Sequence, residues 1–147
     1  MGINEDIKAV FKSPKQKVIV NIRYTANWLG NLQNNYMAQF DLTMPQFNIL
    51  RILRGAKDYI SVNMVKDRMI EKSPNTTRLM DKLIDKKLIE RIRCEEDRRI
   101  VYVKISTEGL SLLEEIDKTF ESSQFYTQKL TEEEAETLNM LLDKIRS

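Results

Sequence analysis

The residues best suited to chemistry lie in the middle of the chain, at the start of a predicted helix. Asn75, Arg78 and Lys82 are spaced three and four residues apart, so they share one helix face, which Thr77 flanks. Asn and Arg can hydrogen-bond the edges of adenine and guanine, while Lys and Thr can bind phosphate or base oxygens. Ser73 precedes a proline in the pattern that opens a helix, where free amides favour a phosphate. The pattern predicts a DNA-reading helix, although an ordinary solvated face has the same composition.

A second candidate group lies in a charged turn between two segments with strand character. Residues 88–93 alternate apolar and charged side chains, and residues 100–105 are rich in β-branched and aromatic ones, so together they predict a β-hairpin. Arg98 and Arg99 at its tip repel each other and cannot lose their protons. We expect one of them to enter a minor groove or bind its phosphates, and Asp97 to orient a neighbouring Arg. An exposed charged turn without such a role is the alternative.

Charge is distributed unevenly along the chain, although the net charge is only +2. Residues 60–104 hold twelve basic and eight acidic side chains, whereas residues 105–147 hold four basic and ten acidic ones. A basic middle segment is compatible with a polyanionic partner. The acidic final third is interpreted as the exposed faces of helices.

The composition argues against an enzyme and against a metal site. The chain has no His and a single Cys, Cys94, which excludes a Cys/His zinc site and removes the commonest general base. It also has no Gly-rich phosphate loop and no paired nucleophile and base at a usable spacing. We therefore predict no catalytic residues, no metal and no cofactor.

The predicted location is the cytoplasm, with no membrane partner. No run of eighteen apolar residues is present, and the first twelve residues lack a signal-peptide pattern. A single Cys is compatible with a reducing compartment.

The helices that position these groups are predicted from apolar spacing and capping signals. Ser13 begins the first predicted helix, and Thr43 begins the second through a capping box. The second helix is expected to end near Gly55. Thr107 and Thr131 begin the last two. Residues 60–62 are predicted as a short extended piece or a helix entry, and residues 1–12 as a poorly specified leader. The predicted helices cover residues 14–39, 43–55, a short segment through Val65 and Met69, 74–87, and long segments after 107 and 131.

The predicted fold class is mainly α with a small β-hairpin wing. We expect one domain over residues 1–147, with a winged helix-turn-helix at 42–105. Residues 13–40 and 106–147 are expected to form a helical dimerisation region.

Residues 60–109 resemble the multiple antibiotic resistance regulator (MarR) family of winged-helix proteins, and the similar layout extends over about residues 14–147. The resemblance rests on five motifs: Leu42–Phe47, Ser73–Leu79, Leu88–Arg91, Asp97–Arg99 and Ile105–Gly109. It implies a homodimer in which the first helix and the last two intertwine, while two winged-helix lobes meet successive major grooves of double-stranded DNA. It also implies a repressor that leaves a near-palindromic operator when a small phenolic or other ligand binds, or when a Cys is oxidised.

By this resemblance, Asn75, Thr77, Arg78 and Lys82 fall on the reading helix and Arg98 and Arg99 on the wing. The full predicted DNA-binding set is Ser73, Asn75, Thr76, Thr77, Arg78, Lys82, Arg98 and Arg99. A winged-helix adaptor that binds protein and not DNA is the alternative function. Four clustered basic residues argue against it, because an adaptor has no need to keep them together.

Two departures from the family pattern concern single positions. Members often have Gly where this chain has Lys87, so the turn there is expected to differ slightly. Redox-sensing relatives use a Cys near the start of the first helix, and residues 1–39 contain none.

Three residues are candidates for sensing an effector. Tyr24 and Trp28, four residues apart on the first helix, could line a pocket for a small aromatic molecule, or serve only as core or dimer contacts. Cys94 has basic neighbours that favour its thiolate and acidic ones that oppose it, so a redox role and an incidental Cys both stay open.

Overall fold

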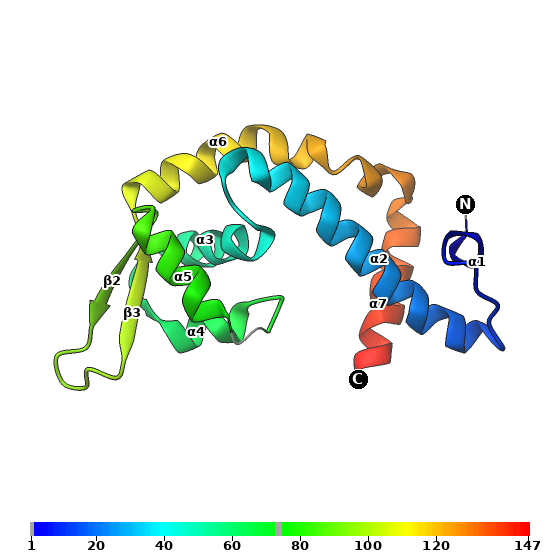
Figure 1. The fold of residues 1–147 in the computed structure, drawn as a ribbon, viewed down its shortest axis with the longest axis horizontal. Helices are drawn as coiled ribbons and strands as arrows, with labels where there is room; N and C mark the ends of the chain where they lie inside the picture. Colours follow the sequence, from blue (N-terminus) through cyan, green and yellow to red (C-terminus); the bar gives the residue numbers. More distant parts are fainter. Residues whose placement is uncertain (1, 73–74) are drawn as a thin grey trace. The chain divides into compact units, whose positions relative to one another are not determined.

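A computed structural model of the chain describes residues 2–72 and 75–147. The chain divides into two compact units, one ending at Ser111 and the other running from Leu112 to Ser147. The confirmed fold class is mainly helical with a small antiparallel sheet, which lies in the first unit (Figure 1). Within the described residues, no helix is long and apolar enough to cross a membrane.

The first unit begins with a short helix that the sequence pattern did not predict. Helix α1 (Ile3–Asp6) lies in the predicted leader, and its Ile3 is buried. Helix α2 (Pro14–Met37) begins as predicted, because the Ser13 hydroxyl accepts a hydrogen bond from the Gln16 amide at 3.2 Å. It ends before residue 39, where the chain tightens into the 3₁₀ helix η1 (Ala38–Phe40).

Helix α3 (Met44–Ala56) carries much of the core of the first unit. The predicted capping box is confirmed: Thr43 Oγ1 accepts from the Gln46 amide at 3.3 Å, and Gln46 Oε1 accepts from the Thr43 amide at 3.1 Å. The helix continues past Gly55 and ends where Lys57 takes the left-handed conformation, with φ of 64°. The fully buried side chains of this helix are Phe47, Ile49, Leu50 and Leu53.

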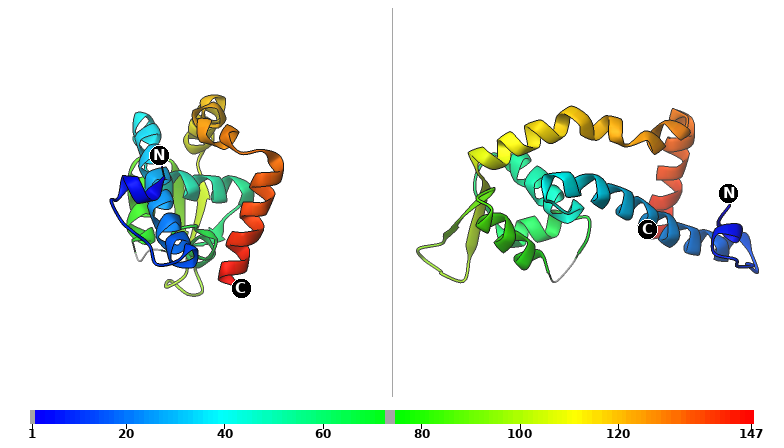
Figure 2. Two further views of the ribbon diagram at one scale, coloured as in Figure 1. Left: turned by 90° about the vertical axis from the view of Figure 1, so that its right-hand side faces the viewer. Right: turned by 45° about the horizontal axis from the view of Figure 1, so that its top comes forward.

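Three strands and two short helices complete the winged-helix part. Strand β1 (Ile60–Ser61) leads into helix α4 (Val62–Arg68), so both expectations for residues 60–62 hold. Helix α5 (Thr76–Asp85) follows, and β2 (Ile89–Arg93) and β3 (Val101–Ile105) form the predicted hairpin. The sheet order is β1-β3-β2, all antiparallel, so the hairpin has a third strand that the sequence pattern left undecided. The hairpin extends away from the other elements of this unit (Figures 1 and 2).

Helix α6 (Thr107–Ser123) begins in the first unit and continues into the second. Its cap is Ser106, whose hydroxyl accepts from the Gly109 amide at 3.0 Å, and not Thr107 as predicted. The second unit then contains η2 (Phe125–Lys129) and α7 (Glu132–Arg146). The predicted capping box at Thr131 is confirmed, and its hydrogen bonds lower the pKa of Glu134.

Candidate nucleic-acid interface

Helix α5 carries the predicted reading residues, and the structure divides them into two groups. Thr77, Arg78 and Lys82 are exposed, and Asn75 is exposed at the N-cap position, one residue before the helix. Thr76 is only 1% exposed and its side chain belongs to the core with Met80 and Leu83, which argues against a contact between this side chain and DNA. The N-cap of α5 is Asn75 and not Ser73 as predicted, because the helix begins at Thr76. The contact expected between Ser73 and a phosphate lies outside the described residues.

The exposed face of α5 presents two cations that no described residue neutralises. Among the described residues, no carboxylate lies within ion-pair distance of Arg78 or Lys82. Their four-residue spacing places them one turn apart on the same side of the helix. Free cations on an exposed helix face are available for phosphates or base edges.

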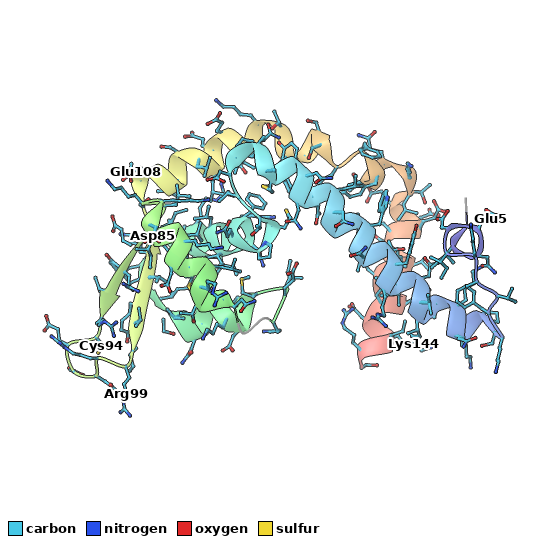
Figure 3. All side chains as sticks on the ribbon, viewed as in Figure 1. Glu5, Asp85, Cys94, Arg99, Glu108 and Lys144 are labelled. Carbon is cyan, nitrogen blue, oxygen red and sulfur yellow. The ribbon has the colours of Figure 1, made fainter. Side chains whose placement is uncertain are left out.

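The tip of the hairpin is organised by a single carboxylate. Asp97 Oδ1 accepts from the Arg99 amide at 3.0 Å and from its Nε at 3.1 Å, and Oδ2 accepts from Nη2 at 3.2 Å. These bonds, the side-chain ones first, lower the pKa of Asp97. The Arg99 side chain is nevertheless 90% exposed, at the free end of the hairpin (Figure 3). Asp97 therefore orients Arg99 as expected and leaves the guanidinium accessible.

Arg93 also shapes the tip, and sequence reasoning assigned it no such part. Its guanidinium donates to the Arg98 carbonyl at 3.2 Å, across the turn from its own strand. The only signal in the sequence was the alternation of β2, which places Arg91 and Arg93 on the same side of the strand. With Arg93 and Asp97 bracing the backbone, the Arg98 side chain has no partner among the described residues and is exposed.

A basic cavity of about 360 Å³ separates α4 and α5 from the hairpin. Arg91 closes one part of it by pairing with Asp81 of α5, with Nη1 and Oδ1 3.4 Å apart. Thr77 of the reading helix and Arg99 of the wing both line this cavity, so the structure brings two predicted site residues from separate elements together. Its charged lining residues are Lys66, Asp81, Arg91, Arg93 and Arg99.

The predicted sensing residues lie elsewhere. Tyr24 and Trp28 are on α2, 38% and 41% exposed, and neither lines the basic cavity. Cys94 is a half-buried free thiol at the base of the turn, and its amide donates to the Ile100 carbonyl at 2.9 Å. Among the described residues, no group of His, Cys, Asp or Glu is arranged to hold a metal ion.

The junction between α5, the hairpin and α6 is tightly packed. Lys87 has φ of 63°, so the left-handed turn forms even though the residue is not Gly. Its carbonyl accepts from the buried Ser106 hydroxyl at 2.7 Å. A Cβ on Gly109 would lie 2.3 Å from the Leu88 carbonyl oxygen, so this position requires Gly. The reading helix is thereby fixed to the first turn of α6.

Comparison with known proteins gives consistent matches over most of the chain. Residues 31–116 match a family model described as the transcriptional regulator SarA/Rot. The chain is 34% identical over 116 residues to the multiple antibiotic resistance protein MarR of Salmonella typhimurium, covering 78% of this chain and 80% of that protein.

Two solved structures that resemble the chain contain DNA. One is a mutant E. coli MarR complexed with operator DNA, which is 26% identical, covers 99% of both chains and has a TM-score of 0.75. The other is an S. aureus MepR–DNA complex, also 26% identical, covering 86% of this chain and 93% of that one, with a TM-score of 0.76.

Proposed function

The chain belongs to the MarR family of winged-helix transcription regulators. From this premise we propose that it is a homodimeric repressor that binds a near-palindromic operator. We propose further that a small-molecule effector releases the repressor from this DNA. That it is a DNA-binding regulator agrees with the relatives whose structures contain DNA. The observation that carries the proposal is the placement of unneutralised cations on α5 together with an oriented, exposed Arg99 on the wing.

In the proposed complex, α5 enters the major groove and the hairpin lies along the adjacent minor groove. Arg78 is suited to pair with a guanine edge, and Asn75 to pair with adenine. Lys82, one turn further along the helix, contacts a phosphate and so fixes the register. Arg98 and Arg99 supply the wing contacts. A narrow minor groove concentrates negative potential, which favours an inserted Arg.

A second copy of the chain is the proposed partner in the protein–protein interface. Exposed apolar side chains lie on α7, among them Leu138, Leu141 and Ile145 at 45–49% exposure. Helix α2 exposes others, including Val18 and Ile19. Clustered apolar surface of this kind marks an interaction site. A two-fold dimer places its reading helices about 34 Å apart, one turn of DNA.

The proposed effector is a small aromatic anion, and the basic cavity is the site that supports it best. Four of its five charged lining residues are basic, and its volume suits a small molecule. Arg99 belongs both to this cavity and to the wing, so a bound carboxylate or phenolate would compete with DNA for the same guanidinium. Tyr24 and Trp28 remain proposed lining residues of a second pocket.

Footprinting of the DNA upstream of the chain's own gene tests the proposal. We expect two protected half-sites, centred one helical turn apart, whose protection requires a higher protein concentration with Arg78→Ala. Protection should also weaken when substituted benzoates or phenols are added, and Arg91→Ala should blunt this response more than Trp28→Ala does. Absence of any protected site there at low salt would contradict an operator at that position and the self-regulation that it implies.

A further inference from the structure

The C-terminal end of α5 is fixed by a lysine that the reading face does not include. Lys86, at the C-cap position, donates through Nζ to the backbone carbonyl of Asp41 and lies 3.1 Å from its Oδ2. Asp41 follows η1 directly and has φ of 55°, so its carbonyl and carboxylate are presented at the end of the first long helix. The Lys86 side chain is 33% exposed and that of Asp41 is 93% exposed, so the pair lies at the surface.

The next residue makes a comparable connection to the other long helix. The Lys87 carbonyl accepts from Ser106, which caps α6. Two consecutive residues at the end of the reading helix therefore connect it to the end of the α2–η1 segment and to the start of α6. Both connections lie within the first unit.

We infer that Lys86 is a positioning residue for operator recognition, acting through Asp41 to set the angle of α5 and not through contact with DNA. This inference rests on the proposed function. It is supported by a contrast with Lys82. The ammonium of Lys82 has no acceptor among the described residues, whereas the ammonium of Lys86 has two acceptors, the carbonyl and the carboxylate of Asp41. An ammonium that already has a carboxylate and a carbonyl as acceptors is less available to a phosphate than a free one.

The rival explanation is that Lys86 binds a phosphate. Lys82 and Lys86 lie one turn apart and line a common cavity with Asp41, so geometry alone permits it. The two explanations predict opposite changes in operator affinity when Asp41 is neutralised. If Asp41 orients α5 through Lys86, neutralising it weakens operator binding; if Asp41 only competes with DNA for Lys86, neutralising it strengthens binding.

The test measures affinity for two DNA duplexes by fluorescence anisotropy at several salt concentrations. The first duplex is the DNA upstream of the chain's own gene, and the second is a scrambled duplex of equal length. The variants are Asp41→Asn, Lys86→Met, their combination, and Lys86→Arg as the conservative replacement. Asn tolerates the left-handed conformation, so Asp41→Asn keeps the backbone. Asp85→Asn, in the last turn of α5 (Figure 3), and Lys118→Gln on α6 are the charge-matched controls.

We expect Asp41→Asn and Lys86→Met each to lower affinity for the upstream duplex by about two- to fivefold, the range of an exposed ion pair. Affinity for the scrambled duplex should stay constant, the double variant should be no worse than Lys86→Met, and Lys86→Arg should recover most of the loss. The Lys118→Gln protein should bind both duplexes as well as the parent does. The Asp85→Asn protein should bind them equally well or slightly better.

A different pattern would overturn the inference. Tighter binding by Asp41→Asn, together with a fall of about 0.9 in the salt slope for Lys86→Met on both duplexes, would make Lys86 a phosphate contact. Unchanged affinity in every variant would show that the connection has no part in recognition. Equal affinity of the parent protein for both duplexes would contradict specific binding to the DNA upstream of its gene. This result is distinct from the others, and it would refute the inference together with the proposed operator. Thermal unfolding of each variant identifies any loss that comes from misfolding.

Discussion

At the residue scale, one carboxylate in the wing restricts the arginine that is proposed to bind DNA. A free Arg side chain loses rotamer freedom when it is immobilised in a groove, which costs on the order of 1 kcal/mol. Asp97 has already restricted Arg99 through three hydrogen bonds, while the side chain remains 90% exposed. Part of the ordering cost is therefore met before DNA arrives. Arg98, next to it, has no such restraint.

The first prediction concerns Asp97→Asn. The amide oxygen of Asn can keep the two bonds that Oδ1 accepts, but its NH₂ group cannot accept from Nη2 and the ionic pair is lost. We therefore expect DNA affinity to fall by about three- to tenfold with little change in thermal stability. Anisotropy titration and a melting curve measure the two quantities. Arg98→Ala in the same turn is the comparison, because the DNA affinity that this variant loses should depend more steeply on salt concentration. Full affinity in Asp97→Asn would contradict the orienting role.

The pH dependence of this pair has a definite sign. Because the pKa of Asp97 is lowered in the folded chain, its contribution is fully present at neutral pH and is lost as pH falls through that lowered value. The wing should therefore keep the pair from pH 7 down through the range in which an ordinary Asp is protonated, about pH 4, and lose it only at lower pH. The Arg99 Nε–H resonance in an NMR pH titration measures this directly, and loss of the pair near pH 6 would be the contrary result.

The third prediction concerns Gly109. A methyl group there would meet the Leu88 carbonyl oxygen at 2.3 Å and Ile105 Cγ1 at 2.7 Å, so Gly109→Ala should destabilise the fold by about 1–3 kcal/mol. Gly55→Ala in α3 is the matched control, because nothing lies within 4 Å of the position that its methyl group would take. That variant should be about 0.5–1 kcal/mol more stable. Urea unfolding measures both, and equal stability of the two variants would argue against the tight junction.

At the element scale, α5 separates packing from recognition by its two faces. Thr76, Met80 and Leu83 are buried while Arg78 and Lys82 are exposed, so substitutions on the second face can change binding without damaging the core. Strand β2 also has two different faces. Successive side chains alternate between them, and Arg91 and Arg93 lie on the face that lines the cavity beside α5. The two elements proposed for recognition are thus connected to each other by the Arg91–Asp81 pair.

The fourth prediction compares the two cations of α5. Arg78→Ala should cost about 1–3 kcal/mol of operator affinity and relax specificity at a single base pair, because it removes a base contact. Lys82→Ala should weaken binding to all sequences alike and reduce the salt slope by about one, because it removes a phosphate contact. Titrations against a set of singly substituted operators separate the two. Equal losses on every sequence for Arg78→Ala would place it on phosphate instead.

Much of the fold followed from local signals, and the exceptions have physical reasons. Capping boxes at Thr43 and Thr131 depend on residues three apart, so sequence reveals them directly. Strand β1 is two residues long, too short for an alternating pattern, and exists only because β3 pairs with it. The cap of α6 shifted to Ser106 because its hydroxyl also reaches Lys87, nineteen residues away, which no local pattern contains.

The candidate site followed the same division. The exposed cations of α5 and the Asp97–Arg99 pair could be predicted because spacing along one helix or one turn determines them. Thr76 was assigned to DNA from its residue type, but at the first position of α5 it is covered by the core. The parts played by Arg93 and Lys86 depend on contacts with backbone carbonyls, which leave no pattern in the sequence.

At the scale of the whole molecule, the proposal requires two copies of the chain. The apolar side chains exposed along α7 should be covered by a partner, so Leu141→Glu should convert the dimer to a monomer at micromolar concentration. Light scattering after size exclusion measures the mass. Glu136→Lys on the same helix is a charge-changing control that should stay dimeric. A wild-type chain that is monomeric at these concentrations would contradict the proposed assembly.

The central claim is that this chain binds a specific DNA sequence through α5 and the wing. The most direct measurement is an anisotropy titration of the wild-type protein against the DNA upstream of its gene and against scrambled DNA, at two salt concentrations, with an Arg78→Ala/Arg99→Ala variant alongside. We predict at least about a hundredfold preference for the upstream DNA, affinity that falls steeply with salt, and loss of the preference in the variant. No binding to either DNA at low salt, or a preference that the variant retains in full, would contradict the claim.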